Sequence, residues 1–285
     1  MSDILGGAAN RMTRHAGIAG RALGHAAHRG EAPRAIARGN HGRRAAGAGL
    51  ALLAILLLCT GCVSPRPAPA QTPGLPAHAA TPESVGMVDI RQLVPDIDLD
   101  IRYAGPRNFT GRRVEGYGAA KCYLLRPAAE ALRNVEVELR GQGLRLRIFD
   151  CYRPARAVRQ FVNWAADPAD QSTKAEYYPA LDKASLVPGY IADRSGHSKG
   201  ATVDLTLLRC GEHGCRPLDM GTAFDFFDPS ANTDHPGIGP EQRDSRARLH
   251  DTMARHGFEN YPMEWWHYTF RMEPPPEAFH DMPIR

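Results

Sequence analysis

The sequence predicts an α+β domain, in which helices and strands are mixed within one fold. Three segments carry helix signals and three carry strand signals, and together they show no repeating βαβ rhythm. A doubly wound parallel sheet requires that rhythm, so the α+β class is favoured over it. All these segments lie within residues 84–285, a stretch long enough for a single domain with its own hydrophobic core.

Residues 1–61 have the composition of an export leader. Residues 1–44 contain eight arginines and only two acidic residues, and residues 45–58, AAGAGLALLAILLL, form an uninterrupted apolar run. This run is too short to cross a bilayer comfortably and has the length of a signal-peptide core. Because positively charged flanks stay on the cytoplasmic side, we expect the chain after the run to be exported.

The CTGC sequence at residues 59–62 resembles the lipidation site of a bacterial lipoprotein signal. Cys62 would be the acylated residue, although Cys59 stands where a leucine is usual. An N-terminal anchor that is never cleaved is the alternative. In both cases we expect the protein on the periplasmic side of a bacterial membrane, with the membrane as a partner of its N-terminal region.

Residues 62–83 predict a tether between the leader and the domain. Six prolines and several alanines occur in residues 63–82 without an apolar period, which is typical of an extended linker. Residues 62–285 carry 27 basic and 29 acidic side chains, so the positive balance of the whole chain belongs to the leader. This charge gives no indication of a nucleic-acid partner.

Helices are predicted at residues 126–142, 155–166 and 240–256. In the first, Pro127 is at a suitable first position and Gly141 lies near the end, with apolar residues along one face. The second follows an Arg-Pro pair, and the third begins with a proline and stops at a glycine.

Strands are predicted at residues 144–150, 201–208 and 263–271. LRLRIFD in the first alternates apolar and basic residues, as expected for a strand with one buried face. The other two, containing ATVDLTLL and MEWWHYTFR, are rich in β-branched or aromatic residues.

Four cysteines lie in the predicted domain, at positions 122, 151, 210 and 215. An even number in an exported protein favours disulfides, and four cysteines allow three pairings. The short CGEHGC loop favours pairing Cys210 with Cys215, which leaves Cys122 with Cys151. A zinc knuckle of Cys210, His213 and Cys215 is the alternative, and it lacks a convincing fourth ligand.

Two separate stretches supply candidate metal ligands. In SGHSKGATVDLTL, residues 195–207, the glycines suit a tight loop that returns His197 to the side of the following strand that carries Asp204. His267, in EWWHY, is the best candidate for a third ligand, and catalytic zinc sites use three protein ligands with an open position. Glu264 would lie beside this site, where a carboxylate can take a proton from water and pass it to a leaving amine.

Each of these residues alone has a simpler interpretation. A single histidine is more often a core or surface residue than a ligand, and Asp204 could cap a turn. Arg153, in DCYRP, could stabilise the oxyanion of a tetrahedral intermediate or could form a structural salt bridge with Asp150. The combined spacing favours a zinc hydrolase over these separate explanations.

Residues 97–285 resemble the D-alanyl-D-alanine dipeptidases of the vancomycin-resistance type, which are zinc peptidases related to bacterial D,D-carboxypeptidases. The resemblance rests on motifs in family order: RYAGPRNFTGRRVEGY (102–117), DCYRPARAV (150–158), SGHSKGATVDLTL (195–207), DMGTAFDFF (219–227) and GFENYPMEWWHY (257–268). It implies a single zinc-peptidase domain with a central, mostly antiparallel sheet and flanking helices.

The resemblance also implies the roles of the site residues. His197, Asp204 and His267 match the ligands of one zinc ion, Glu264 matches the general base and acid, and Arg153 matches the arginine that stabilises the transition state. The implied reaction is hydrolysis of D-Ala-D-Ala to two D-alanines.

Four further positions match residues around the dipeptide pocket. Asp150, Tyr103 and Ser195 correspond to positions that shape or line it, and Asp225 corresponds to a supporting residue near the site. Gly196 departs from the family, which often has a second serine there.

The export signal is a second departure, because the drug-resistance enzymes act in the cytoplasm. We therefore expect a role in cell-envelope peptide turnover or D-alanine salvage rather than in resistance. The alternatives are a zinc D,D- or L,D-carboxypeptidase that trims muropeptides, and a lipid-anchored binding protein that has lost catalysis.

Overall fold

The computed structural model describes residues 80–285, so the predicted leader, Cys62 and most of the tether lie outside the described part of the chain. A six-stranded sheet forms its centre: five strands follow the order β2-β4-β5-β8-β7, and the sixth, β6, pairs with the end of β5. A separate two-stranded sheet joins β1 and β3. The strands are β1 (Met87–Asp89), β2 (Asp98–Leu99), β3 (Tyr123–Leu125), β4 (Leu144–Asp150), β5 (Thr202–Gly211), β6 (Gly214–Pro217), β7 (Phe258–Asn260) and β8 (His267–Phe270).

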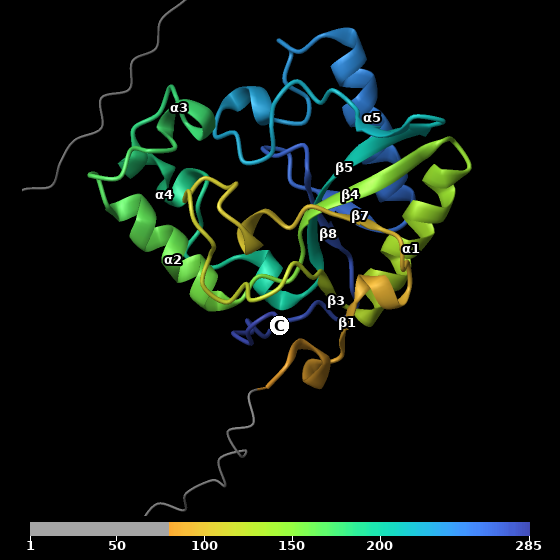
Figure 1. Ribbon diagram of the computed structural model, residues 1–285, viewed down its shortest axis with the longest axis horizontal. Coiled ribbons are helices and arrows are strands. Elements are labelled where there is room, and N and C mark those ends of the chain that lie inside the picture. Colours follow the sequence, from red (N-terminus) through yellow and green to blue (C-terminus); the bar gives the residue numbers. More distant parts are fainter. Residues whose placement is uncertain (1–79) are drawn as a thin grey trace, which may run out of the picture. The chain divides into compact units, whose positions relative to one another are not determined.

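Helices lie on both sides of this sheet. In Figure 1, α1 and α5 lie to the right of the central strands, while α2, α3 and α4 lie to the left. The helices are α1 (Arg126–Arg140), α2 (Ala155–Ala166), α3 (Lys174–Tyr177), α4 (Leu186–Gly189) and α5 (Pro240–Arg255). Within residues 80–285 no helix is long and apolar enough to span a membrane.

The predicted α+β class and the mostly antiparallel sheet are confirmed. Strand β4 pairs in parallel with β2, and the other pairings of the central sheet are antiparallel. In β4 the buried side chains of Leu144, Leu146 and Ile148 alternate with two half-buried arginines, as the strand pattern indicates. Strand β5 lies in the middle of the sheet, and its residues from Thr202 to Leu208 are all buried.

The last predicted strand is wrong at its start. The prediction placed it at residues 263–271, whereas β8 covers His267–Phe270 and the preceding residues form a turn. In this turn the backbone N–H of Tyr261 donates to the carbonyl of His267, and that of Glu264 donates to the carbonyl of Tyr261. Pro262 has no N–H to contribute to a strand ladder, which favours the turn. Glu264 therefore lies in this turn and not in a strand.

The C-terminal residues pack against the loops that surround the candidate site. The N–H of His280 donates to the carbonyl of Ser198, and the N–H of Ala155 donates to the carbonyl of His280. Further along, the N–H of Met282 donates to the hydroxyl of Tyr152 at 2.8 Å. This segment therefore links the start of α2 to the loop before β5.

Candidate metal and catalytic site

The register of three neighbouring strands brings the site together. Asp150 at the end of β4 lies opposite Asp204 in β5, and Asp204 lies opposite His267 at the start of β8. A register shift in β4 between Ile148 and Asp150 accompanies this alignment. Irregularities of this kind re-aim side chains beside active sites. The sheet therefore presents three polar side chains, far apart in sequence, as one row.

His197 reaches this row from the short 3₁₀ helix Gly196–Lys199 that precedes β5. Gly200 ends that helix with a φ of +81°, and a side chain there would meet Met87 Cε at 2.5 Å, so the tight turn requires glycine. The His197 ring donates from Nδ1 to the carbonyl of Cys151 at 2.7 Å. This hydrogen bond leaves the Nε2 lone pair directed toward the row.

The donor atoms of His197, Asp204 and His267 all lie within 4.8 Å of one another. His197 Nε2 is 3.2 Å from Asp204 Oδ2 and 3.3 Å from His267 Nδ1, and His267 Nδ1 is 3.1 Å from Asp204 Oδ1. Asp204 Oδ1 is buried and accepts no hydrogen bond of acceptable geometry from the described residues. Two imidazole nitrogens and a carboxylate face one another, with His197 and Asp204 buried and His267 half-buried. This arrangement fits a zinc ion with an open coordination position.

The pKa shifts of His197 and Asp204 agree with a cation site, whereas burial opposes and the charge of Asp204 produces a raised pKa at His267 in the metal-free protein. Burial lowers the pKa of His197, which favours the neutral, ligating imidazole. Burial alone would raise the pKa of Asp204, but the two histidines beside it hold that pKa below its ordinary value. Asp204 is therefore a charged ligand between two imidazoles.

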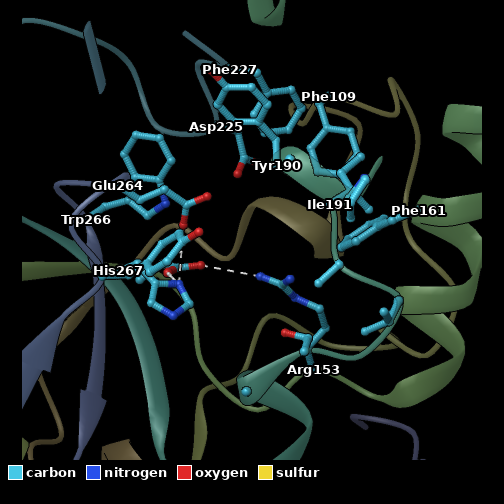
Figure 2. Close-up of a pocket in the computed structure, with 18 of the residues that line it drawn as sticks. Phe109, Arg153, Phe161, Tyr190, Ile191, Asp225, Phe227, Glu264, Trp266 and His267 are labelled. Carbon is cyan, nitrogen blue, oxygen red and sulfur yellow. Dashed lines mark hydrogen bonds and ion pairs between the residues drawn. The ribbon is translucent and has the colours of Figure 1, made fainter. Parts of the chain in front are cut away.

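Glu264 lies at the edge of this cluster. Its Oε2 is 3.4 Å from His267 Nδ1, and Figure 2 shows its carboxylate directed into the pocket beside Trp266. Burial raises the pKa of Glu264 to about 7; the nearby Asp204 adds to this rise, while His267 and Arg153 oppose it. A carboxylate with such a pKa can both accept and return a proton near neutral pH.

Arg153 faces the metal ligands from the other side of the pocket. Its Nε donates to Asp150 Oδ2 at 2.9 Å, and its Nη2 lies 3.4 Å from Asp204 Oδ2, the contact drawn as a dashed line in Figure 2. The guanidinium also lies over the rings of Tyr103 and Phe161, at 5.0 and 5.3 Å from their centroids. Arg153 thus forms the structural salt bridge with Asp150 and also points into the pocket, so the two interpretations of this residue are compatible.

Asp150 takes a different place from the one expected for a residue that lines the pocket. It is 1% exposed and is not among the residues that border the cavity. Its carboxylate is occupied by Arg153 and by the hydroxyl of Tyr117, which donates to Oδ1 at 2.7 Å. Asp150 therefore shapes the pocket by orienting Arg153.

A cavity of about 310 Å³ opens above these groups. Ser195, Tyr103 and Asp225 border it together with Arg153 and Glu264. Much of the remaining wall is aromatic, formed by Phe109, Phe161, Tyr190, Phe227, Tyr261 and Trp266. The result is a small pocket that is polar at the end of the metal ligands and mostly aromatic elsewhere, except for Asp225.

Asp225 projects into this cavity from the wall that faces the metal ligands (Figure 2). Its backbone has a φ of 61°, which is unusual for a residue other than glycine. The hydroxyl of Tyr103 donates to its two carboxylate oxygens, at 3.0 and 3.1 Å. Burial, followed by the negative charge of Asp204, raises the pKa of Asp225 well above its ordinary range. A strained, buried carboxylate of this kind is typical of a functional position.

Both disulfides that the sequence favours are present. Cys122 is bonded to Cys151, and Cys210 is bonded to Cys215 across the β5–β6 hairpin. The pairing of Cys210 and Cys215 excludes the alternative zinc knuckle with His213.

Several site residues were not predicted from the sequence. Tyr117 is the last letter of a motif that the resemblance uses, but nothing in its neighbours indicates a contact with Asp150. Tyr190 and Ile191 come from a segment without a periodic pattern, directly after α4, which packs against α2. These residues are brought to the site by tertiary packing, which has no local signal.

The M15 peptidase family model, described as D-ala-D-ala dipeptidase, matches residues 83–284. A D-alanyl-D-alanine dipeptidase of Enterococcus faecium is 38% identical over 202 residues, covering 70% of this chain and 99% of that protein. Proteins of the same name from Streptomyces coelicolor and Escherichia coli are 40% and 32% identical, covering 68% and 65% of this chain and 96% and 85% of their own lengths.

Among solved structures, a zinc-bound D,D-pentapeptidase from a vancomycin-resistance cassette is 17% identical, with a TM-score of 0.32 over 52% of this chain and 73% of that chain. A similarity at this level carries no argument about the present site.

Proposed function

The chain belongs to the D-alanyl-D-alanine dipeptidase family of M15 peptidases, and we propose on this basis that it is a zinc-dependent enzyme that hydrolyses D-Ala-D-Ala to two D-alanines. The observation that carries the proposal is the convergence of His197, Asp204 and His267 on one point, at the polar end of a small cavity. A zinc ion held by these ligands supplies Lewis acidity toward the scissile carbonyl and the attacking water.

Glu264 is the proposed general base and acid. Its carboxylate takes a proton from the water as the oxygen–carbon bond forms, and it gives that proton to the amine as the peptide C–N bond breaks. Burial raises the pKa of this group to about 7 in the metal-free protein, and the positive charge of bound zinc would lower it, which favours the ionised form that accepts the proton from water. The contact with His267 at 3.4 Å keeps the carboxylate beside the metal ligands.

Arg153 is the proposed partner of the oxyanion that develops on the scissile carbonyl. It is 13% exposed and held by Asp150, so its guanidinium needs little rearrangement as charge develops. The neighbouring rings of Tyr103 and Phe161 restrict water around the positive charge. A charge in such surroundings stabilises a transition state more strongly than the same charge in water.

Asp225 is the proposed partner of the substrate's free ammonium group. It is the carboxylate that borders the cavity across from the metal ligands, and an ammonium beside it would favour its ionised form despite its raised pKa. A pocket of about 310 Å³ with an aromatic wall suits two alanine side chains. We therefore propose specificity for a short peptide with an unblocked amino terminus.

The test is release of D-alanine from D-Ala-D-Ala by the zinc-loaded chain, compared with Glu264→Gln. We expect the variant to lose about 10²–10⁴-fold in kcat, the usual range for a general base, while zinc content stays unchanged. Glu259→Gln is the matched control, because Glu259 lies on β7 nearby, is 61% exposed and pairs with Arg271. Cleavage of a D-Ala-D-Ala-terminated pentapeptide but not of the dipeptide would replace this proposal with a carboxypeptidase, and an inert zinc-loaded wild type would indicate a binding protein.

We further propose that the enzyme acts on the periplasmic side of a bacterial membrane, anchored through Cys62, in envelope peptide turnover or D-alanine salvage. The leader composition and the two disulfides of the described domain support an oxidising, exported location. Membrane fractionation of the wild type and of Cys62→Ala, with fatty-acid labelling, tests the anchor. Unchanged growth of a deletion strain on D-Ala-D-Ala as a D-alanine source would refute the salvage role.

A further inference from the structure

The Cys122–Cys151 disulfide lies directly beside the zinc ligands. Cys122 precedes β3 and Cys151 follows β4, and the two residues are 0% and 1% exposed. The carbonyl oxygen of Cys151 accepts the hydrogen bond from His197 Nδ1 at 2.7 Å. One half of the disulfide therefore supplies the contact that fixes which nitrogen of His197 faces the metal position.

Residues 151–153 support His197 in a second way. The backbone N–H of Arg153 donates to the carbonyl of His197 at 3.3 Å, so the ring and the backbone of this ligand both rest on the same short segment. The segment also carries the Arg153 guanidinium into the pocket. A displacement of Cys151 would consequently move a metal ligand and the oxyanion partner together.

Among the described residues, the disulfide and one backbone hydrogen bond join this segment to the β1–β3 sheet. It lies beyond the last register pair of β4, Asp150 with Asp204. The N–H of Tyr152 donates to the carbonyl of Tyr123 at 3.0 Å. The disulfide adds a covalent bond to Cys122, which is itself anchored because its carbonyl accepts from the N–H of Ile90 at 2.9 Å.

We propose that the Cys122–Cys151 disulfide is a positioning element of the zinc site, which raises zinc affinity by holding the Cys151 carbonyl against His197. The inference rests on the proposed function, since it requires zinc at His197, Asp204 and His267. The second disulfide has no such role, because Cys210 and Cys215 close the hairpin at the far end of β5 and border no part of the cavity.

The test compares two double variants of the full chain, Cys122→Ala/Cys151→Ala and Cys210→Ala/Cys215→Ala. Alanine leaves no thiol that could bind zinc itself. Zinc dissociation constants are measured by competition with a chromophoric chelator, at a temperature where circular dichroism shows every protein to be folded. We expect the first variant to bind zinc about tenfold more weakly, at the low end of the range for disturbed outer contacts of a ligand, and the second to match the wild type. Equal zinc affinity of the two variants would overturn the proposal.

A second measurement applies if the first variant does not fold. Coupling is reciprocal, so a disulfide that strengthens zinc binding must itself be stabilised by bound zinc. In glutathione redox buffers, the midpoint for reduction of Cys122–Cys151 should move by about 30 mV between the metal-free and zinc-loaded wild type, which corresponds to tenfold coupling. The Cys210–Cys215 midpoint is the internal control, and an equal or absent shift for both disulfides would overturn the proposal.

These experiments distinguish an error in the proposed function from an error in the proposed role of the disulfide. A wild-type protein that binds no zinc overturns the proposed function together with this inference. Zinc binding that is normal in the wild type and indifferent to the Cys122–Cys151 bond overturns this inference alone.

Discussion

Replacing Arg246 by methionine would test how the loop that carries Asp225 is held in place. Arg246 lies on α5 and is 2% exposed. Its guanidinium donates to the carbonyls of Met220 at 2.7 Å, Ser230 at 3.0 Å and Asn232 at 2.6 Å. These carbonyls stand at the beginning and at the end of the loop, so a single side chain ties the two ends together.

The expected loss of stability follows from the carbonyls that would be left without a donor. The carbonyl of Asn232 keeps its hydrogen bond from the N–H of His235 at 3.0 Å, whereas those of Met220 and Ser230 have no other donor among the described residues. A buried carbonyl without a partner costs about 1–3 kcal/mol, which applies to Met220; the carbonyl of Ser230 is only partly buried and adds less than that. Methionine fills most of the side-chain volume, which limits any additional cavity cost.

Urea unfolding of the zinc-loaded proteins measures this loss, with Arg248→Met as the control. Arg248 is exposed two residues further along α5 and contacts Gln142, so its replacement should change stability by less than about 0.5 kcal/mol. We also expect Arg246→Met to raise KM for D-Ala-D-Ala more than it lowers kcat, at a temperature where it is folded, because Asp225 lies within the loop while Glu264 lies outside it. A destabilisation below about 1 kcal/mol would refute this reasoning, which predicts that at least the buried carbonyl of Met220 is left without a donor.

Three further outcomes are expected. Tyr103→Phe removes the hydroxyl that donates to Asp225 and should lower kcat/KM by about 5–150-fold, equivalent to about 1–3 kcal/mol, in steady-state assays; an unchanged value would separate Asp225 from substrate binding. Arg153→Lys keeps a positive charge beside Asp150 but loses the planar fork, so kcat should fall by about 10²–10³-fold with zinc content unchanged, and a wild-type kcat would exclude the oxyanion role. Burial raises the pKa of Glu264 to about 7, above its value in the unfolded chain, so the stability that its protonated form contributes is present at acidic pH and is lost as the pH rises through about 7. Metal-free Glu264→Gln should therefore be more stable than metal-free wild type at about pH 8, by up to about 3 kcal/mol, and no more stable at about pH 4. Urea unfolding at both pH values measures this difference, and equal stability of the two proteins at about pH 8 would contradict the burial of the carboxyl group.

Local sequence signals predicted the elements that frame the site. Strand β4 has the predicted bounds, as does α2, and α1 and α5 end within two residues of the predicted positions. Their signals are local, namely alternation of apolar residues for β4 and an initial proline for α1 and α5. The small strands β1, β2 and β7 were not predicted, because they contain only two or three residues and depend on pairing with distant partners.

The chemistry of the site was more predictable than its walls. His197, Asp204 and His267 stand out because their side chains are unusual in or beside apolar strands, and the structure brings them together. The place of Asp150 behind Arg153 depends on an irregular strand register, which no spacing in the sequence reveals. The aromatic wall comes from segments in which the sequence pattern does not distinguish an aromatic residue that lines a pocket from one that lies in the core.

The row of Asp150, Asp204 and His267 across three strands makes the metal site a reporter of correct folding. A slip of β5 by one residue would turn Asp204 to the opposite face of the sheet and leave the histidines without their shared carboxylate. Since these strands are joined by long intervening segments, their alignment is completed only when distant parts of the chain have met. Zinc at a hundredfold excess over its dissociation constant would add about 2.7 kcal/mol to the stability of the aligned sheet, and misaligned sheets would gain none of it. The ion that the enzyme needs for catalysis thus also selects the folded chains that can use it.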